Sequence, residues 1–124
     1  MNNSFLKYNW PSILWAGVIL LLCLMPGKDL PSISLWEFDK IGHFCVYVLL
    51  ALLMYYGWKK QNVYRFFHQH MLLKILIITS AYGFAVEIMQ DLFTADRHFD
   101  LLDALANSIG AVTGSLISVK LFKV

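Results

Sequence analysis

The stretch IGHFCVYVLLALLMYYGW at residues 41–58 decides the fold class, because it contains no Asp, Glu, Lys or Arg. A helix crosses the hydrocarbon of a bilayer with about 20 mostly apolar residues, within a range of about 17–25. Three further, mostly apolar stretches occupy about residues 10–25, 71–93 and 101–122, and Pro11 suits the first turn of the first one. We therefore predict four membrane-spanning helices.

The composition of the chain excludes an ordinary soluble fold. Hydrophobic residues make up 59% of the 124 residues and charged residues 15%, against about 25% charged in soluble domains. A soluble domain of this length buries too little surface to hide so many apolar side chains. The apolar stretches also lack the alternating pattern of an outer-membrane barrel. We predict a single all-α domain over residues 1–124, an integral membrane four-helix bundle.

Lys and Arg are distributed unequally over the predicted termini and connections. The side with both termini and the connection between the second and third helices contains Lys7, Lys59, Lys60, Arg65, Lys74, Lys120 and Lys123. The other side contains Lys28, Lys40 and Arg97. Because short cytoplasmic connections are enriched in Lys and Arg, both termini are predicted to be cytoplasmic. The net charge of +2 is too small and too scattered to indicate nucleic-acid binding.

Polar and small residues follow helical spacing on the last three predicted helices. They share one face of each helix. These faces consist of Asp39, His43 and Tyr47; of Ser80, Gly83, Glu87 and either Gln90 or Asp91; and of Asp100, Asp103, Asn107, Gly110, Gly114 and Ser118. His43, Glu87 and Asn107 lie roughly 5–9 Å below the outer ends of their helices. Together with Arg97, these faces are predicted to converge on one pocket at the extracytoplasmic surface.

This predicted pocket contains groups suited to acid–base and binding chemistry. A charge at the centre of the hydrocarbon costs about 2.5–3.5 kcal/mol, so such groups need partners or a function. His43 and Glu87 form the predicted catalytic pair, because an imidazole and a carboxyl group can exchange protons with a substrate. Arg97 can clamp a phosphate or a carboxylate. The other predicted ligand-binding residues are Asp39, Gln90, Asp100, Asp103 and Asn107.

Two alternatives concern the same polar residues. The carboxylates and the imidazole are compatible with a divalent cation such as Zn, Mn or Fe, but no compact ligand motif supports one. We therefore predict a site without a metal or another cofactor. Buried polar residues also hold membrane helices together, at roughly 0.6 kcal/mol per pair. Helix packing is the role predicted for Gly110 and Gly114, which have the small-xxx-small spacing.

A resemblance to the VanZ-like family rests on two segments, DKIGHFCVYVLLALL at 39–53 and EIMQDLFTADRHFDLLDALANSIGAVTG at 87–114. The positions that match the family pattern are Asp39, Lys40, His43, Tyr47, Glu87, Gln90, Arg97, Asp100, Asp103, Asn107, Gly110 and Gly114. The resemblance adds Lys40 to the predicted ligand-binding residues. It implies a small multi-pass protein of the bacterial cytoplasmic membrane, with a namesake that lowers sensitivity to the glycopeptide antibiotic teicoplanin.

The pocket and the resemblance together predict a protein that binds or acts on an amphiphile of the cell envelope, either a lipid-linked head group or a lipoglycopeptide. One alternative is an intramembrane enzyme in which His43 and Glu87 supply acid–base chemistry on a lipid head group. Another is a structural partner subunit whose working surface contains Gly110 and Gly114. Membrane lipids are expected partners in each case, and the pattern indicates no particular oligomeric state.

Overall fold

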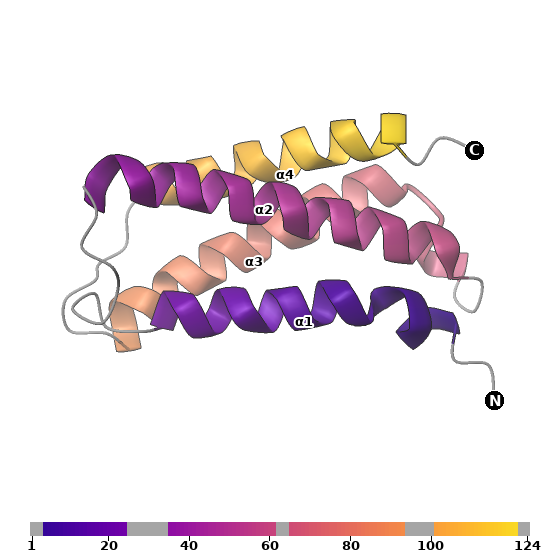
Figure 1. The fold of residues 1–124 in the computed structure, drawn as a ribbon, viewed down its shortest axis with the longest axis horizontal. Helices are drawn as coiled ribbons and strands as arrows, with labels where there is room; N and C mark the ends of the chain where they lie inside the picture. The colour runs from indigo at the N-terminus through magenta and orange to yellow at the C-terminus, as the bar shows by residue number, and fades with distance from the viewer. Residues whose placement is uncertain (1–3, 25–34, 62–64, 94–100, 122–124) are drawn as a thin grey trace.

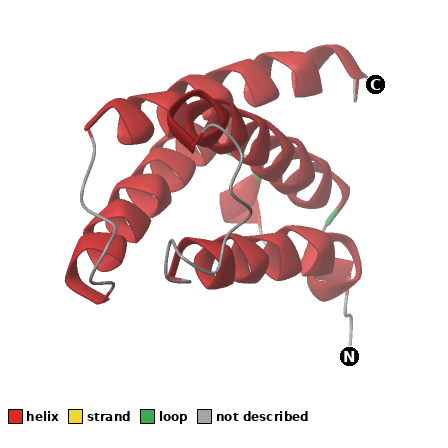
Figure 2. Cartoon of the chain, turned by 60° about the vertical axis from the view of Figure 1, so that its left-hand side comes forward, coloured by secondary structure: helices red, strands yellow, loops and turns green. Residues whose placement is uncertain are grey.

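A computed structural model shows four long helices that follow one another along the chain (Figure 1). The structure describes residues 4–24, 35–61, 65–93 and 101–121, without the side chains of residues 4 and 35–40. The elements are α1 (Ser4–Leu24), α2 (Leu35–Lys60), the 3-10 helix η2 (Arg65–Phe67), α3 (Met71–Phe93) and α4 (Leu101–Leu121). No strand occurs in these ranges (Figure 2), and each long helix contains a segment able to cross a membrane. The predicted all-α, four-span fold is confirmed.

The first helix begins earlier than the apolar run predicts. α1 starts at Ser4 rather than near residue 10, so Pro11 lies inside the helix and not in its first turn. Proline has no amide hydrogen, and the helix loses one backbone hydrogen bond there. Asn9 ties this part of α1 to α2, because its Nδ2 donates to the carbonyl oxygen of Gly57 at 3.1 Å. A tertiary contact thus supports helical turns that the hydropathy pattern did not include.

The helices run alternately in opposite directions, which gives the bundle two distinct ends. The last turns of α1 and α3 and the first turns of α2 and α4 lie together on the left of Figure 1, and the two termini lie on the right. α2 makes its most extensive contact with α4 and also packs against α1 and α3. α2 is therefore the central helix of the bundle.

Two glycines of α4 lie where this helix packs against α2. A Cβ atom at Gly110 would stand 2.5 Å from the carbonyl oxygen of Phe44, and one at Gly114 would stand 2.9 Å from the Cβ of Ala51. A larger residue at either position would push the helices apart. Glycines four residues apart permit this close approach between membrane helices. The contact sets the separation of two of the helices that carry the polar residues described below.

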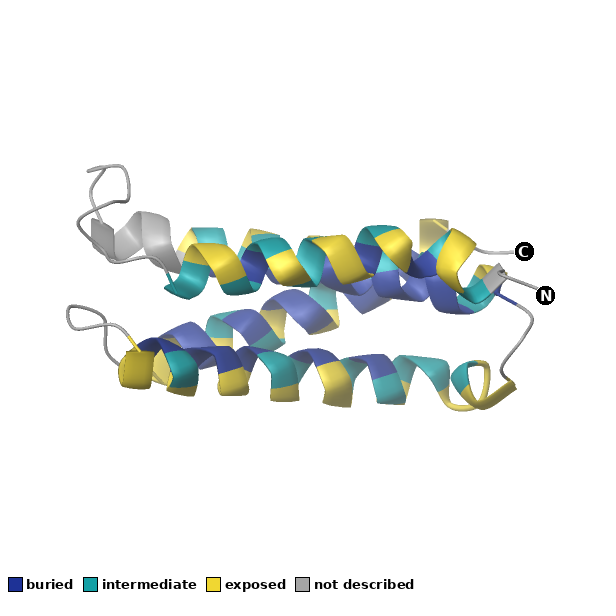
Figure 3. Ribbon diagram, turned by 90° about the horizontal axis from the view of Figure 1, so that it is seen from below, coloured by how far each residue is buried: buried dark blue, intermediate teal, exposed yellow. Residues whose placement is uncertain are grey.

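Polar side chains fill much of the interior of the bundle, and apolar side chains cover its outside. Figure 3 shows buried positions on the facing sides of the helices and exposed positions on their outer sides. The buried polar residues include Asn9, His43, Thr79, Glu87, Gln90, Asp103, Asn107, Ser115 and Ser118. The outer positions include Leu21, Leu92 and Leu116, which are 67%, 72% and 61% exposed. This pattern suits helices that face lipid and turn their polar groups inward.

Charged side chains differ between the two ends of the bundle. The described Lys and Arg side chains belong to the end with the termini, and they are Lys7, Lys59, Lys60, Arg65, Lys74 and Lys120. The described carboxylates belong to the other half, and they are Glu87, Asp91 and Asp103. Enrichment of Lys and Arg marks the cytoplasmic side of membrane proteins. The cytoplasmic location of both termini stays a prediction, and the arrangement of charges supports it.

Candidate functional site

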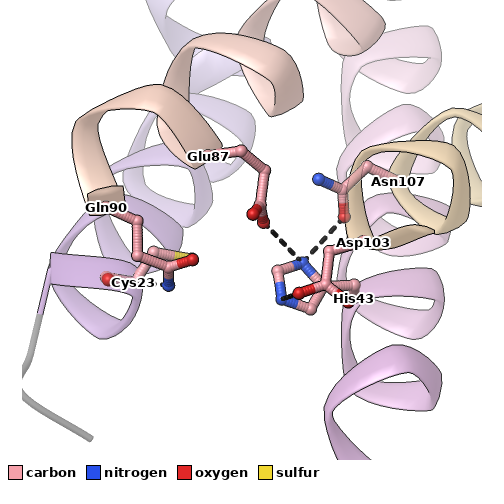
Figure 4. A network of polar contacts seen from close by, with 6 residues as sticks. All are labelled: Cys23, His43, Glu87, Gln90, Asp103 and Asn107. Atoms are coloured by element: carbon pink, nitrogen blue, oxygen red, sulfur yellow. Dashed lines mark hydrogen bonds and ion pairs between the residues drawn. The ribbon is translucent and has the colours of Figure 1, made fainter. Parts of the chain in front are cut away.

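His43 on α2 is the centre of a polar cluster formed by three helices (Figure 4). Its Nδ1 lies 2.9 Å from Oδ1 of Asn107 and 3.6 Å from Oε1 of Glu87. Its Nε2 lies 3.8 Å from Oδ2 of Asp103. We call these four residues the His43 cluster. The structure thus brings together four of the residues that the sequence analysis assigned to one site.

The geometry of the helices explains why these side chains meet. Asp103 and Asn107 are four residues apart and share one face of α4. On α3, Gly83 lies one turn before Glu87, and a Cβ atom at Gly83 would stand 3.0 Å from the Cβ and the Nδ2 of Asn107. The missing side chain at Gly83 therefore leaves the space that Asn107 occupies. This contact holds α3 and α4 at the distance at which Glu87 reaches the imidazole.

The His43 cluster is almost fully shielded from its surroundings. The exposed fraction is 7% for His43, 0% for Glu87, 5% for Asp103 and 1% for Asn107. Electrostatic interactions and hydrogen bonds are stronger in such a low-dielectric interior than in water. Polar groups placed there affect one another strongly, and a ligand that enters the cluster would be held by the same forces.

The position of His43 between two carboxylates allows proton transfer across the ring. In the neutral tautomer with hydrogen on Nδ1, the ring donates to Oδ1 of Asn107 and its acceptor Nε2 lies on the side of Asp103. In the protonated ring both nitrogens are donors, and Glu87 and Asp103 flank them. Imidazole is the side chain best suited to change between these forms near neutral pH. The arrangement is chemically competent for acid–base work.

Gln90 makes a separate contact beside the His43 cluster. It is 2% exposed, and its Nε2 donates to the carbonyl oxygen of Cys23 at 2.9 Å. Cys23 belongs to the last turn of α1, where carbonyl groups have no partner within the helix. The bond therefore joins the end of α1 to α3, and Figure 4 shows the two residues beside each other. Gln90 was predicted to bind a ligand, and in the structure its amide nitrogen donates to the backbone of α1.

Four other predicted site residues lie outside the described side chains. They are Asp39, Lys40, Arg97 and Asp100. The backbone of the first two belongs to the first turns of α2, close to His43 along the helix. Asp91 on α3 is an exposed carboxylate in the same half of the bundle.

Tyr47 is a polar neighbour of the cluster that was predicted to share a face with His43 but not to be a catalytic or ligand-binding residue. The residue is 1% exposed, and its hydroxyl group has no hydrogen-bond partner in the described part of the chain. It interacts electrostatically with Glu87, and its ring lies 6.4 Å from that of Tyr82. The hydroxyl of Tyr82 donates to the carbonyl oxygen of Ala16. The four-residue spacing from His43 is the sequence signal that identifies Tyr47.

Comparison with known proteins identifies a family. The family model described as VanZ/LLP1 matches residues 3–123, nearly the whole chain. No curated protein and no solved structure matches it. The match includes all four helices and every residue of the His43 cluster, and it confirms the resemblance that rests on residues 39–53 and 87–114.

Proposed function

The chain belongs to the VanZ/LLP1 family, and from the buried cluster around His43 we propose that it binds the polar head group of a cell-envelope amphiphile. The observation that carries the proposal is the meeting of His43 with Glu87, Asp103 and Asn107 inside helices that are otherwise apolar on their outer faces. Ionisable groups within membrane spans are rare and costly, and they mark binding or transfer sites.

The side chains of the cluster suit a head group rich in hydrogen-bond donors. The ionised carboxylates of Glu87 and Asp103 only accept hydrogen bonds, and the amide of Asn107 both accepts and donates. Sugar hydroxyls and amines supply the matching donors. Lipid-linked sugars and lipoglycopeptides share this chemistry, so the proposal covers both sources and the experiment below separates them.

Exposed apolar residues on the outer faces of the helices, at the depth of the cluster, support an amphiphile rather than a fully polar ligand. Ile41 is 62% exposed and precedes His43 by two positions on α2. Leu101 and Leu105, which flank Asp103 on α4, are 60% and 49% exposed. A hydrocarbon chain can pack against these outer positions while its head group turns toward the interior of the bundle.

The charge distribution supports an extracytoplasmic site in the bacterial cytoplasmic membrane. The described Lys and Arg side chains lie at the opposite end of the bundle from the His43 cluster. The positive end faces the cytoplasm under the rule for short connections, so the cluster faces outward. This location agrees with the family-level association with teicoplanin, a lipid-tailed glycopeptide that acts outside the membrane.

Binding of defined probes to the purified full chain in lipid nanodiscs tests the proposal. The probes are teicoplanin, a polyprenyl-linked sugar, and phosphatidylethanolamine as a lipid with an amine and no sugar. We expect saturable binding of at least one probe. Glu87→Gln and Asp103→Asn keep the size of the side chain but remove a charged acceptor worth about 1.5–3 kcal/mol, so each weakens binding by about tenfold or more.

The matched control is Asp91→Asn, which removes an exposed carboxylate from the same half of α3 and is expected to leave the affinity unchanged. Helical circular dichroism of each variant separates loss of the site from loss of the fold. Failure of the wild-type protein to bind any probe overturns the proposal. So does equal binding by the wild type and both cluster variants.

A second function is favoured by the pairing of His43 with Glu87. Nδ1 of His43 lies 3.6 Å from Oε1 of Glu87. In that function the protein is an intramembrane enzyme that moves a proton on the bound head group. Incubation of the purified protein with envelope lipids, followed by mass spectrometry of the products, tests it. A product that forms with the wild type and not with His43→Ala supports catalysis, and no turnover across lipid classes counts against it.

A further inference from the structure

We propose that His43, Glu87 and Asp103 bind one divalent transition-metal ion inside the bundle. Each residue offers a ligand atom, and these atoms all lie within 4.8 Å of one another. The three residues belong to α2, α3 and α4, so the bound ion joins three helices. Metal binding does not require the head-group binding proposed above, and the two are measured separately.

The donor atoms and their separations suit a first-row transition metal. Imidazole nitrogen and carboxylate oxygen bind Zn²⁺ at about 2.0–2.2 Å, and Mn²⁺ and Fe²⁺ accept the same donors. Two ligands of a tetrahedral ion are then about 3.3–3.6 Å apart. The largest separation of 4.8 Å therefore closes with side-chain shifts of less than about 1 Å.

Asn107 supplies a further oxygen at the site. Its Oδ1 lies 2.9 Å from Nδ1 of His43. A histidine that binds a metal commonly donates the hydrogen of its other ring nitrogen to an oxygen, which fixes the tautomer and the orientation of the ring. At this distance Oδ1 can accept the hydrogen of Nδ1 and orient His43 in that way. Asn107 thereby strengthens metal binding.

The other end of the Asn107 amide indicates an occupant of the cluster. Nδ2 has no hydrogen-bond partner in the described part of the chain, although the residue is only 1% exposed. This atom lies on the α3 side, because a Cβ atom at Gly83 would stand 3.0 Å from it. Buried donors without a partner are rare in folded proteins. A water or a head-group oxygen on the metal ion would accept this hydrogen bond.

The number of protein ligands indicates a working site rather than a structural one. Structural zinc sites have four protein ligands, whereas sites that act on a ligand have three and keep a position for water or substrate. The His43 cluster offers three metal-ligating side chains. An ion there adds a positive charge to a pair of carboxylates, and it extends the head groups that the site can hold to phosphates.

Titration of the full chain with metal alone, in detergent and without any lipid probe, tests the proposal. Chelator-treated protein is titrated with Mn²⁺, and the signal of the free ion is followed by electron paramagnetic resonance. Co²⁺ provides an absorption spectrum that reports its coordination. We expect one Mn²⁺ per chain and a Co²⁺ spectrum typical of nitrogen and oxygen ligands. Ca²⁺ and Mg²⁺, which prefer oxygen ligands alone, are expected to compete weakly.

Substitutions connect the ion to the proposed ligands. Asn107→Ala is expected to weaken Mn²⁺ binding by about 10–100-fold, the usual effect of losing an orienting partner. Glu87→Gln and Asp103→Asn remove ligands and should weaken binding at least as much. Asp103→Glu keeps a carboxylate and should retain binding. Asp91→Asn changes an exposed carboxylate and should bind as the wild type does.

The absence of saturable Mn²⁺ and Co²⁺ binding by the wild type overturns the proposal. Equal binding by the wild type, Glu87→Gln and Asp103→Asn also overturns it, as does an equal loss in Asp91→Asn. If a ligand variant does not fold, the unfolding temperature of the wild type decides: added Mn²⁺ must raise it and chelator must reverse the rise. Metal binding without head-group binding upholds this proposal and contradicts the proposed function.

Discussion

His43 and Asn107, 64 positions apart in the chain, are joined by a 2.9 Å hydrogen bond between Nδ1 and Oδ1 in the interior of the bundle. The bond connects α2 to α4, the pair of helices with the most extensive contact. One turn further along α4, Gly110 holds the backbones close. The polar contact at the site and the packing of the bundle are therefore parts of the same interface.

We expect His43 and Asn107 to show a measurable coupling energy. Side-chain hydrogen bonds between membrane helices couple by about 0.6 kcal/mol on average and by up to about 1.7 kcal/mol. A double-mutant cycle with His43→Ala and Asn107→Ala, measured by unfolding in mixed detergent micelles, gives this energy. His43→Ala and Ser118→Ala form the control pair and should be additive, because Ser118 bonds to its own helix at Gly114. A coupling near zero for the first pair contradicts the contact.

Two glycine substitutions are expected to change stability in opposite directions. Gly110→Ala places a Cβ atom 2.5 Å from the carbonyl oxygen of Phe44, and overpacking of this kind costs about 1–3 kcal/mol. Gly17→Ala places its Cβ where no atom lies within 4 Å, and it should stabilise α1 by about 0.5–1 kcal/mol. The free energy of unfolding of each variant in detergent checks the pair. If neither substitution lowered the free energy of unfolding, α2 and α4 would have to be further apart than the 2.5 Å distance at Gly110 indicates.

Replacement of Gln90 tests whether this residue binds a ligand or only joins α3 to α1. Gln90→Leu keeps the approximate size of the side chain but removes the donor to the carbonyl oxygen of Cys23. We expect it to lower the free energy of unfolding by about 0.6–1.7 kcal/mol and to leave teicoplanin and Mn²⁺ affinities unchanged. The sequence-based assignment to ligand binding predicts the reverse, a loss of affinity at full stability. Both quantities are measured on the same preparation.

Cysteine labelling is expected to place the two ends of the bundle on opposite sides of the membrane. In a variant that lacks Cys23 and Cys45, a single cysteine replaces either Gln69, in the exposed connection before α3, or Asp91, exposed near the other end. A membrane-impermeant maleimide added to intact bacterial spheroplasts should label position 91 and not position 69, since Lys and Arg gather near position 69. Labelling of position 69 alone would invert the predicted orientation.

The fold class was predictable because hydrophobic length is a local property. The length and apolar composition of residues 41–58 predict a membrane-spanning helix whatever the rest of the chain contains. The same holds for the other three apolar runs. The start of α1 was not predictable in this way. Its first turns depend on the contact of Asn9 with Gly57, and no pattern within residues 4–9 indicates that contact.

The sequence by itself determined which polar residues share a face and a depth, because helical periodicity sets the angle and rise of each side chain within its own helix. His43, Glu87, Asp103 and Asn107 were assigned to one site on that basis. Only the tertiary structure decided which atoms meet. The rotation and separation of the helices depend on close packing at glycines such as Gly83 and Gly110. A shift of one helix by a few ångströms at these glycines would change the partner of a buried polar group. Asn107 contacts the imidazole of His43, whereas Gln90 contacts a backbone carbonyl group.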